Sequence, residues 1–384
     1  HKSHENSGTI SSDLSFRCSP DFYGEVLMKR LVKCGDVEIG GGSCVSIQSM
    51  TNTKTTDVEA TVIQIRELEE AGCQIVRLAV PDMDAAEAFK RIRSKVHVPL
   101  VADIHFDHRL AIAAIEAGAD KVRINPGNIG SEENVRKVIE HAKMRRIPIR
   151  VGVNSGSLEK DILTAWGGVT AEGLAESALR NVAMLEKYDF EDIVISLKSS
   201  DVRMNYEAYK IVHARSPYPL HIGVTEAGTP SRGKIKSAAG IGALLLEGIG
   251  DTLRVSLTAD PVEEVRFARE LLAALGIRKD SVEIVSCPTC GRTEVDLEAI
   301  VQEVEKKAQL LSEKRDFSIK IAVMGCAVNG PGEAKGADIG VACGKGKGLL
   351  FKDGEIVRSV KEEDIADELM KMAEEYAKDT GKLD

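Results

Sequence analysis

EAGCQIVRLAV at residues 70–80, EAGADKVRINP at 116–126 and LEGIGDTLRVSL at 246–257 decide the fold of this chain. Each segment reads as the end of a helix, then a glycine, a short turn and a buried strand. Gly72 and Gly118 stand where glycine commonly ends a helix, because glycine tolerates a left-handed backbone. This repeated unit predicts a fold in which strands and helices alternate.

Short β-branched runs alternate with amphipathic stretches between residues 45 and 280. The runs are apolar rather than cleanly alternating, which suits strands covered on both faces, as in parallel sheets. Eight such units predict a closed (β/α)8 TIM barrel, with an open doubly wound sheet as the alternative. That alternative calls for a glycine fingerprint after the first strand, whereas the glycines at 40–42 precede it. The predicted strands are 45–50, 75–80, 99–104, 121–125, 148–154, 192–198, 219–225 and 252–257.

Three aspartates stand at the start of amphipathic stretches, namely Asp57, Asp84 and Asp107. The first backbone amides of a helix have no partner within the helix, and an aspartate side chain can accept a hydrogen bond from them. We therefore predict that each of these residues caps a helix.

Composition and charge exclude several classes of protein. The 384 residues are 43% hydrophobic and 29% charged, which is an ordinary balance for one large globular domain or two smaller ones. A net charge of -9 opposes binding to nucleic acid, and 4% aromatic residues are few for stacking on bases. The chain has no apolar run long enough to span a membrane. Its eight cysteines are too sparse for a disulfide scaffold, so we expect a cytoplasmic protein.

The pattern changes near residue 280. A strand runs into a cysteine pair in SVEIVSCPTCGRT at 281–293, and a helix, two strands, a hairpin around Asp353-Gly354 and a closing helix follow. These elements predict a small α+β domain. We expect a disordered leader at 1–20, a barrel domain at 21–280 and the small domain at 281–384.

Basic and polar residues gather at the carboxyl ends of the predicted strands, where a (β/α)8 barrel keeps its reactive groups. Buried charges are costly unless paired, so one interpretation is a set of internal ion pairs with Asp103 and Glu226. Few acids are available at that level, and a phosphorylated ligand would neutralise the surplus. Glu226 is then a candidate acid or base. The candidate ligand-binding residues are Arg123, Asn125, Arg150, Asn154, Lys198, Arg254 and Ser256.

Cys287 and Cys290 form a C-x-x-C motif, and Cys326 follows in the segment MGCAVNGPGE at 324–333. Such a motif occurs in zinc sites, in redox pairs and in iron–sulfur sites. The chain has no second C-x-x-C and no histidine after His221, so a four-thiolate ribbon and a Cys3His zinc site within the small domain are excluded. Another type of structural zinc site, or simply reduced buried thiols, remains the alternative.

The fourth ligand of a metal site built on these three cysteines has two candidates. Cys343 offers a further thiolate, and Glu333 follows the turn at 329–332, which folds the chain back. A carboxylate is a poor ligand for a purely structural cluster, but it suits a cluster in which one iron must be released to substrate.

Eight segments together resemble the 4-hydroxy-3-methylbut-2-enyl diphosphate synthase family of the non-mevalonate isoprenoid pathway. The resemblance runs from about residue 23 to residue 355 and matches the two-domain, bacterial-type layout. It implies a TIM barrel followed by a small iron–sulfur domain of the ferredoxin or sulfite-reductase type. The segments are VSIQSMTNTKTTDVEATVIQI (45–65), VPLVADIHFD (98–107), VRINPGNIG (122–130), GVNSGSLEKD (152–161), PLHIGVTEAG (219–228), EGIGDTLRVSLTADP (247–261), SCPTCGRTEVD (286–296) and MGCAVNGPGEAKGADIG (324–340).

The resemblance also implies an activity. The family opens 2-C-methyl-D-erythritol 2,4-cyclodiphosphate reductively and dehydrates it, with two electrons passing from flavodoxin or ferredoxin through a [4Fe–4S] cluster. In the family, the cluster domain of one subunit covers the barrel of its partner, which implies a homodimer with shared active sites. The catalytic glutamate falls on Glu226, and the diphosphate-binding positions fall on the seven barrel residues named above. The cluster ligands fall on Cys287, Cys290, Cys326 and Glu333, which favours Glu333 over Cys343.

The chain departs from the family pattern at one position. Some members carry an arginine at the position of Thr56, and the nearest basic residue here is Lys54. A competing hypothesis makes the protein a non-redox barrel lyase or aldolase with a structural zinc domain. In that hypothesis Lys198 would form a Schiff base with the substrate.

Overall fold

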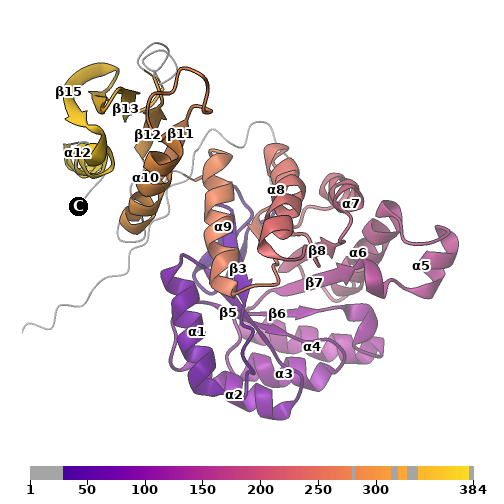
Figure 1. The fold of residues 1–384 in the computed structure, drawn as a ribbon. Coiled ribbons are helices and arrows are strands. Elements are labelled where there is room, and N and C mark those ends of the chain that lie inside the picture. The colour runs from indigo at the N-terminus through magenta and orange to yellow at the C-terminus, as the bar shows by residue number, and fades with distance from the viewer. Residues whose placement is uncertain (1–28, 279–281, 313–318, 327–335, 380–384) are drawn as a thin grey trace, which may run out of the picture.

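The computed structural model describes residues 29–278, 282–312, 319–326 and 336–379. Helices surround one set of strands, and a second set of strands carries its own helices (Figure 1). The described strands form a two-stranded, an eight-stranded and a five-stranded sheet. The leader expected at 1–20 lies outside the described residues.

The eight-stranded sheet is entirely parallel and runs in the order β8-β7-β6-β5-β4-β3-β10-β9. A bridge between Ile195 and Leu220 joins its two ends. The predicted (β/α)8 barrel is therefore confirmed, and every strand lies within its predicted run. The strands are β3 (Ser46–Met50), β4 (Ile75–Ala79), β5 (Leu100–Asp103), β6 (Lys121–Ile124), β7 (Ile149–Asn154), β8 (Ile193–Lys198), β9 (His221–Ile222) and β10 (Thr252–Leu253).

Most helices of the barrel begin where the side chain of a capping residue accepts a hydrogen bond from one of the first amides. Asp57 and Asp107 cap α1 and α3, as predicted. The predicted cap at Asp84 is wrong, because α2 begins at Met83 and the side chain of Asp82 accepts the capping hydrogen bond. The helices are α1 (Val58–Glu70), α2 (Met83–Arg93), α3 (His108–Glu116), α4 (Glu132–Arg145), α5 (Lys160–Ala165), α6 (Ala171–Glu186), α7 (Val202–Arg215), α8 (Pro230–Leu246) and α9 (Pro261–Ala274), with 3-10 turns η1 (Pro126–Asn128) and η2 (Ser155–Ser157).

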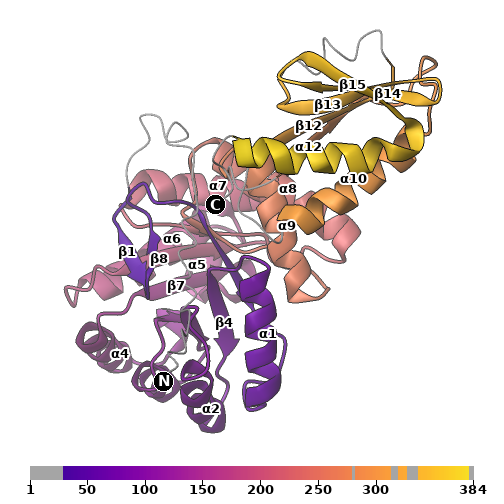
Figure 2. The same cartoon turned by 90° about the vertical axis from the view of Figure 1, so that its left-hand side faces the viewer.

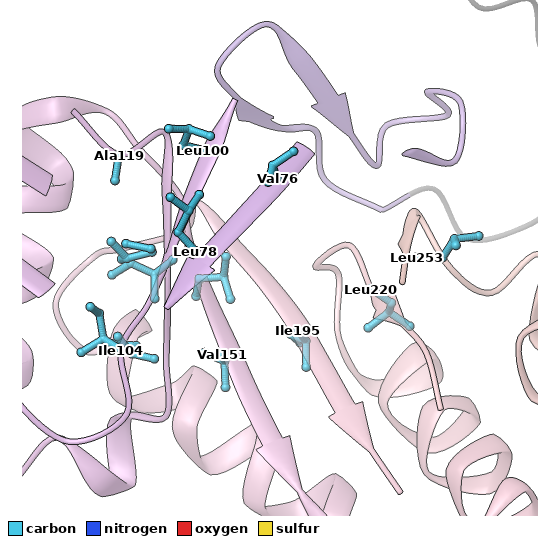
Figure 3. Close-up of a cluster of buried hydrophobic side chains, with 14 of the residues drawn as sticks. Val76, Leu78, Leu100, Ile104, Ala119, Val151, Ile195, Leu220 and Leu253 are labelled. Carbon is cyan, nitrogen blue, oxygen red and sulfur yellow. The ribbon is translucent and has the colours of Figure 1, made fainter. Parts of the chain in front are cut away.

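The two faces of the barrel strands differ in polarity. Val76 and Leu78 of β4 belong to an apolar layer that packs with the surrounding helices (Figure 3). Side chains alternate along a strand, so Ile75 and Arg77 point to the opposite face, which is the barrel interior. Both faces are buried, which explains why the runs do not alternate cleanly between apolar and exposed polar residues. The outward face is mostly apolar, with Ser49 of β3 as an exception, whereas the interior carries polar side chains such as Gln48 and Arg150.

A hairpin that the sequence analysis did not predict fills the amino-terminal end of the barrel. It consists of β1 (Val32–Cys34) and β2 (Val37–Ile39), which pair antiparallel. Its apolar side chains cluster with inward-facing residues at the start of three barrel strands, so this end is closed by apolar packing. The cluster comprises Val32, Cys34, Ile39, Ile75, Val101 and Val194.

The five-stranded sheet is mixed, and it carries α10 and α12 on one face (Figure 2). Asp353 and Gly354 both have positive φ, at 51° and 83°, so the hairpin predicted at this pair is confirmed. None of the helices in the described ranges is long and apolar enough to cross a membrane. The elements are β11 (Val282–Ser286), α10 (Leu297–Ser312), β12 (Ile319–Met324), β13 (Ile339–Gly344), β14 (Lys347–Lys352), β15 (Glu355–Lys361), η3 (Glu362–Asp364) and α12 (Ile365–Asp379).

Candidate active site

Basic side chains from five different strands or strand ends converge in the barrel interior. Four of them are at most 8% exposed, and the side chain of Arg254 is 15% exposed. Burial lowers the pKa of the lysine well below its ordinary value, and the charges of the four arginines lower it further. The five side chains therefore lie close to one another. The group consists of Arg77, Arg123, Arg150, Lys198 and Arg254, and we call it the basic cluster.

One carboxylate, Asp103, lies within the basic cluster. Its Oδ1 accepts a hydrogen bond from Nη1 of Arg123 at 3.3 Å, and its Oδ2 lies 3.9 Å from Nε of Arg77. Oδ2 is also 3.4 Å from Nε2 of His105. Burial alone would raise the pKa of Asp103, but these three neighbours together with Arg150 hold it well below its usual range. Asp103 is therefore a fixed negative charge, as the ion-pair interpretation expected.

Arg77 is a member of the basic cluster that the sequence analysis missed. Its Nε and Nη2 lie 3.1 and 2.9 Å from the thioether sulfur of Met50. Burial lowers the pKa of Arg77 to about 10. A signal was present in the sequence, because the run IVRLA at 75–79 places an arginine at mid-strand in the same way as the runs around Arg123 and Arg254.

Deeper in the barrel, several cationic or polar side chains have no acceptor. Within the described ranges, Nε and Nη1 of Arg150, both ring nitrogens of His221 and Nζ of Lys121 are buried without a hydrogen-bond partner. Burial lowers the pKa of Lys121 to about 8, and it lowers that of Arg150 well below its ordinary value. Buried polar groups in folded proteins almost always have partners, so this interior is built to receive an anion or ordered water.

Two glycines make room for the long basic side chains. A Cβ at Gly152 would lie 2.5 Å from Nε of Arg123, which is closer than real Cβ contacts allow. A Cβ at Gly223 would lie 2.5 Å from the carbonyl oxygen of Arg254 and 3.3 Å from Nζ of Lys198. A larger residue would therefore collide with the side chain of Arg123 at position 152 and mainly with the backbone of Arg254 at position 223.

The predicted neutral donors lie beside the basic cluster. Asn154 is in register with Lys198 on the neighbouring strand, and it is half-buried. Asn125 is 5% exposed, and its Oδ1 accepts the amide of Gly127 at 3.2 Å, so one of its roles is to cap η1. Ser256 follows the end of β10 and is half-buried.

Glu226 occupies the loop after β9 and is exposed. Its φ is 51°, a left-handed conformation that is costly for a residue other than glycine and that clusters at functional sites. None of the ion pairs between described residues includes Glu226, so it does not neutralise the basic cluster. Arg254 instead pairs with Glu264, 3.3 Å away. Lys54 and Thr56, in the loop after β3, are both exposed.

The cysteine residues of the predicted metal site follow two adjacent parallel strands. Cys287 directly follows β11, and Cys326 follows β12 after one glycine. The amide of Gly325 donates to Sγ of Cys287 at 3.1 Å, which ties the two strand ends together. Cys290 is exposed in a turn, where its amide donates to Oγ1 of Thr293 at 3.2 Å.

The donor set at these strand ends fits a soft metal centre. Thiolates are the typical ligands of iron–sulfur clusters, and a backbone amide directed at a ligand sulfur tunes such clusters. Across the described ranges, no three histidine, cysteine or carboxylate side chains are close enough together to hold a metal. Glu333 lies outside the described residues. Cys343 is fully buried in β13, and burial raises its pKa to about 12, which disfavours the thiolate.

Two family models cover most of the chain. The GcpE TIM-barrel domain matches residues 29–269, and the GcpE protein C-terminal domain matches residues 283–375.

The chain belongs to the GcpE family.

Other GcpE proteins are similar along nearly their whole length. The 4-hydroxy-3-methylbut-2-en-1-yl diphosphate synthase (flavodoxin) of Clostridium perfringens is 60% identical over 345 residues, which cover 90% of this chain and 98% of the relative. The protein of the same name from Caldanaerobacter subterraneus subsp. tengcongensis is 57% identical over 352 residues, covering 92% and 98%. The resemblance stated from the eight segments is therefore confirmed. Among solved structures, a dihydropteroate synthase of Xanthomonas albilineans covers 64% of this chain and 97% of its own with a TM-score of 0.47 and 15% identity, too weak a likeness to bear on function.

In this GcpE protein the two groups of residues offer different chemistry. The basic cluster, with neutral donors beside it, can bind and polarise a phosphorylated ligand. The cysteines at the ends of β11 and β12 can hold a soft metal centre that transfers electrons. Together they suit a redox reaction on a phosphorylated substrate.

Proposed function

We infer that this chain is an oxidoreductase that converts 2-C-methyl-D-erythritol 2,4-cyclodiphosphate to 4-hydroxy-3-methylbut-2-enyl diphosphate in non-mevalonate isoprenoid biosynthesis. The names of the curated relatives support the inference, and so does the length over which they match. The structural observation that carries it is the basic cluster, whose five basic side chains include three arginines close to the carboxylate of Asp103. A cyclic diphosphate supplies the negative charge that such an interior lacks.

The proposed diphosphate site uses residues from four barrel strands and the segments that follow them. Arg123, Arg150, Lys198 and Arg254 donate charge-assisted hydrogen bonds to the phosphate oxygens, with Asn125, Asn154 and Ser256 as neutral donors. Ring opening turns the diphosphate into a leaving group, and donors already fixed in a buried site stabilise that developing charge without reorganising. The contacts that hold Arg77 and Arg123 on Asp103 keep these donors in place before substrate arrives.

Cys287, Cys290 and Cys326, with Glu333 as the fourth ligand, are the residues that would hold a [4Fe–4S] cluster. The adjacent ends of β11 and β12 and the amide of Gly325 directed at Cys287 support this assignment. The cluster, when bound, supplies the two electrons that the reaction consumes, one at a time. The relatives' name specifies flavodoxin, so we propose flavodoxin, or a ferredoxin in its place, as the electron donor.

Glu226 is the proposed proton donor to the departing hydroxyl group. Its loop follows β9 at the carboxyl end of the barrel, where reactive groups of this fold lie. Its left-handed backbone fits a residue held for function rather than for stability. Positioned proton donors of this kind typically contribute 10²–10⁴-fold in rate.

The remaining proposals concern organisation. We propose a barrel domain at 21–280, a cluster domain at 281–384, and a homodimer in which the active site is shared between chains. A cytoplasmic location agrees with the need of the cluster for a reducing environment. Substrate is a small molecule, and the acidic charge opposes a nucleic-acid partner.

Anaerobic turnover tests the proposed function. Protein purified without oxygen is incubated with the cyclodiphosphate and reduced flavodoxin, and the products are identified by mass spectrometry. We expect 4-hydroxy-3-methylbut-2-enyl diphosphate and about four irons per chain. Zinc in place of iron, together with conversion of the cyclodiphosphate to a redox-neutral product without any reductant, would instead favour the lyase or aldolase with Lys198 as nucleophile.

A further inference from the structure

Glu264 is a buried carboxylate that the proposed mechanism does not use. It lies on α9 and is 4% exposed. Its Oε2 accepts from Nε of Arg254 at 3.3 Å and from Oγ of Ser49 at 3.2 Å. Its Oε1 accepts from Nη2 of Arg254 at 3.4 Å and from the backbone amide of Leu257 at 2.9 Å. Four donors therefore satisfy this carboxylate, which offsets the cost of burying it.

These four hydrogen bonds connect the first and the last strand of the barrel in chain order, which are neighbours in the sheet. Ser49 belongs to β3, and Arg254 follows β10 directly. The two strands pair with each other, so Glu264 fastens the seam between the first and the last strand of the barrel. The carboxylate of Glu264 therefore fixes the side chain of Arg254, which is one proposed diphosphate ligand. It also fixes the backbone at Leu257, which directly follows the proposed ligand Ser256.

The orientation of Arg254 follows from this arrangement. Glu264 binds its Nε and Nη2 on one edge of the guanidinium group. The remaining nitrogen, Nη1, lies 3.6 Å from the sulfur of Met50, which is a weak acceptor that Arg77 shares. A phosphate oxygen is a far stronger acceptor than a thioether, so Nη1 is the part of Arg254 that is available to an anion.

We propose that Glu264 is a positioning residue for the diphosphate, acting through Arg254 and the backbone at Leu257. The proposal rests on the proposed function, since it takes Arg254 and Ser256 as ligands of the substrate. Glu264 holds one edge of the guanidinium group so that the opposite nitrogen faces the barrel interior. An arginine without this partner would have to be ordered by the substrate itself, and that ordering weakens binding.

The test compares Glu264→Gln with Glu263→Gln in the complete, cluster-containing enzyme. Glu263 is the neighbouring residue on the same helix, but its side chain is 42% exposed and pairs with Lys234 and Arg266 at 3.6 and 3.8 Å. Both variants remove one negative charge from the same turn, so they share any effect on the helix dipole. Only Glu264→Gln places an amide NH2 group against the guanidinium group of Arg254.

Calorimetric titration with the cyclodiphosphate gives the dissociation constant, and turnover gives KM and kcat separately. We expect Glu264→Gln to raise the dissociation constant and KM about tenfold while kcat stays within about threefold, because ground-state and transition-state contacts to the diphosphate are weakened alike. Glu263→Gln should leave all three within about twofold. A dissociation constant of Glu264→Gln within twofold of the parent, or one lower than the parent, would overturn the proposal.

A double-mutant cycle shows whether Glu264 acts through Arg254. In an Arg254→Ala background, Glu264→Gln should change the dissociation constant by less than about threefold, because interacting residues are not additive. A full tenfold effect in that background would refute the positioning role. If Glu264→Gln does not fold, Glu264→Asp keeps the charge but shortens its reach, and the proposal then predicts about a threefold weaker affinity. Unchanged affinity in that variant would overturn it.

Inorganic pyrophosphate separates the failure of this proposal from the failure of the proposed function. If the parent binds pyrophosphate but not the cyclodiphosphate, the substrate assignment is wrong. The positioning role of Glu264 is then tested by the dissociation constant for pyrophosphate, which is again compared between Glu264→Gln and Glu263→Gln. If the parent binds neither, Arg254 is no diphosphate ligand and the proposal fails with the site.

Discussion

The barrel interior and the cysteine-bearing strand ends of the small sheet place their functional groups in opposite ways. In the barrel, Arg77 and Arg123 are at most 8% exposed and both lie against the carboxylate of Asp103, and Arg77 also contacts the sulfur of Met50. In the small sheet, Cys290 is exposed, and one amide hydrogen bond to Cys287 joins the strand ends. Burying several basic side chains together lowers the stability of the folded chain as long as no anion is bound. A soft metal centre differs, because binding of the metal itself brings its ligands together.

The largest expected effect concerns the small sheet. Replacement of Cys287, Cys290 or Cys326 by serine should abolish cluster assembly, because thiolates are the strong ligands for iron. The readout is iron and sulfide content with the absorbance near 400 nm of anaerobically purified protein. Cys343→Ser is the matched control, and it should keep its cluster because Cys343 is buried in the core of the sheet. Retention of four irons in Cys326→Ser, or their loss in Cys343→Ser, would contradict the assignment.

The next effect concerns Glu226, which is exposed and belongs neither to the basic cluster nor to the cysteine-bearing strand ends. Glu226→Gln should bind substrate and accept electrons, yet turn over 10²–10⁴-fold more slowly, because the amide cannot donate the proton. Anaerobic turnover with a reduced dye, beside a calorimetric binding measurement, separates the two properties. A rate within about threefold of the parent would rule out the acid role.

A substitution at Arg150 tests whether the basic cluster lowers the free energy of unfolding while it strengthens anion binding. Arg150→Met should weaken substrate binding about tenfold to a hundredfold, from the loss of a charge-assisted hydrogen bond worth about 1.5–3 kcal/mol. The same variant should raise the free energy of unfolding by about 1 kcal/mol, because an apolar residue replaces a buried cation whose Nε and Nη1 have no acceptor.

Urea denaturation and calorimetry measure both changes in Arg150→Met. Arg136→Met on the surface of α4 is the control, since Arg136 pairs with the exposed Glu133 and Glu140, and neither property should change. A less stable Arg150→Met protein with unaltered affinity would mean that Arg150 is structural.

The smallest effect is a proton linkage at Lys198. Burial, then Arg77 and Arg254, lowers the pKa of Lys198 well below its ordinary value, which favours the neutral amine in the free protein. A bound diphosphate raises that pKa again, so binding takes up protons and weakens as the pH rises. Calorimetry at pH 8 in two buffers of different ionisation enthalpy measures the uptake. Lys198→Arg, which stays charged, should take up fewer protons, and equal uptake in both proteins would place the linkage on another group.

The sequence predicted those features that follow from a repeated local pattern. The eight strand runs and the caps at Asp57 and Asp107 depend on neighbours along the chain, and all of them are found. The hairpin β1–β2 was missed because three-residue strands are too short for a periodicity to identify. Glu264 was missed because an acidic residue early in a helix is ordinary, and only the fold brings it to Arg254.

Arg77 shows a second limit of prediction from sequence, which concerns the partner of a residue rather than its presence. Its pattern was visible in the sequence, but its pairing with Asp103 depends on which strands are neighbours in the barrel. The alternative partner Glu226 could not be rejected from sequence, because its exposed, left-handed position is a property of the loop after β9.

The most direct test of the account is whether the proposed metal centre of the small sheet responds to substrate bound at the proposed site in the barrel. The cyclodiphosphate is titrated into chemically reduced, anaerobic protein while the electron paramagnetic resonance spectrum is recorded. The account predicts a changed spectrum that saturates at the dissociation constant found by calorimetry, and at a correspondingly higher concentration in Arg150→Met. A spectrum that stays constant while calorimetry shows substrate bound would contradict the account.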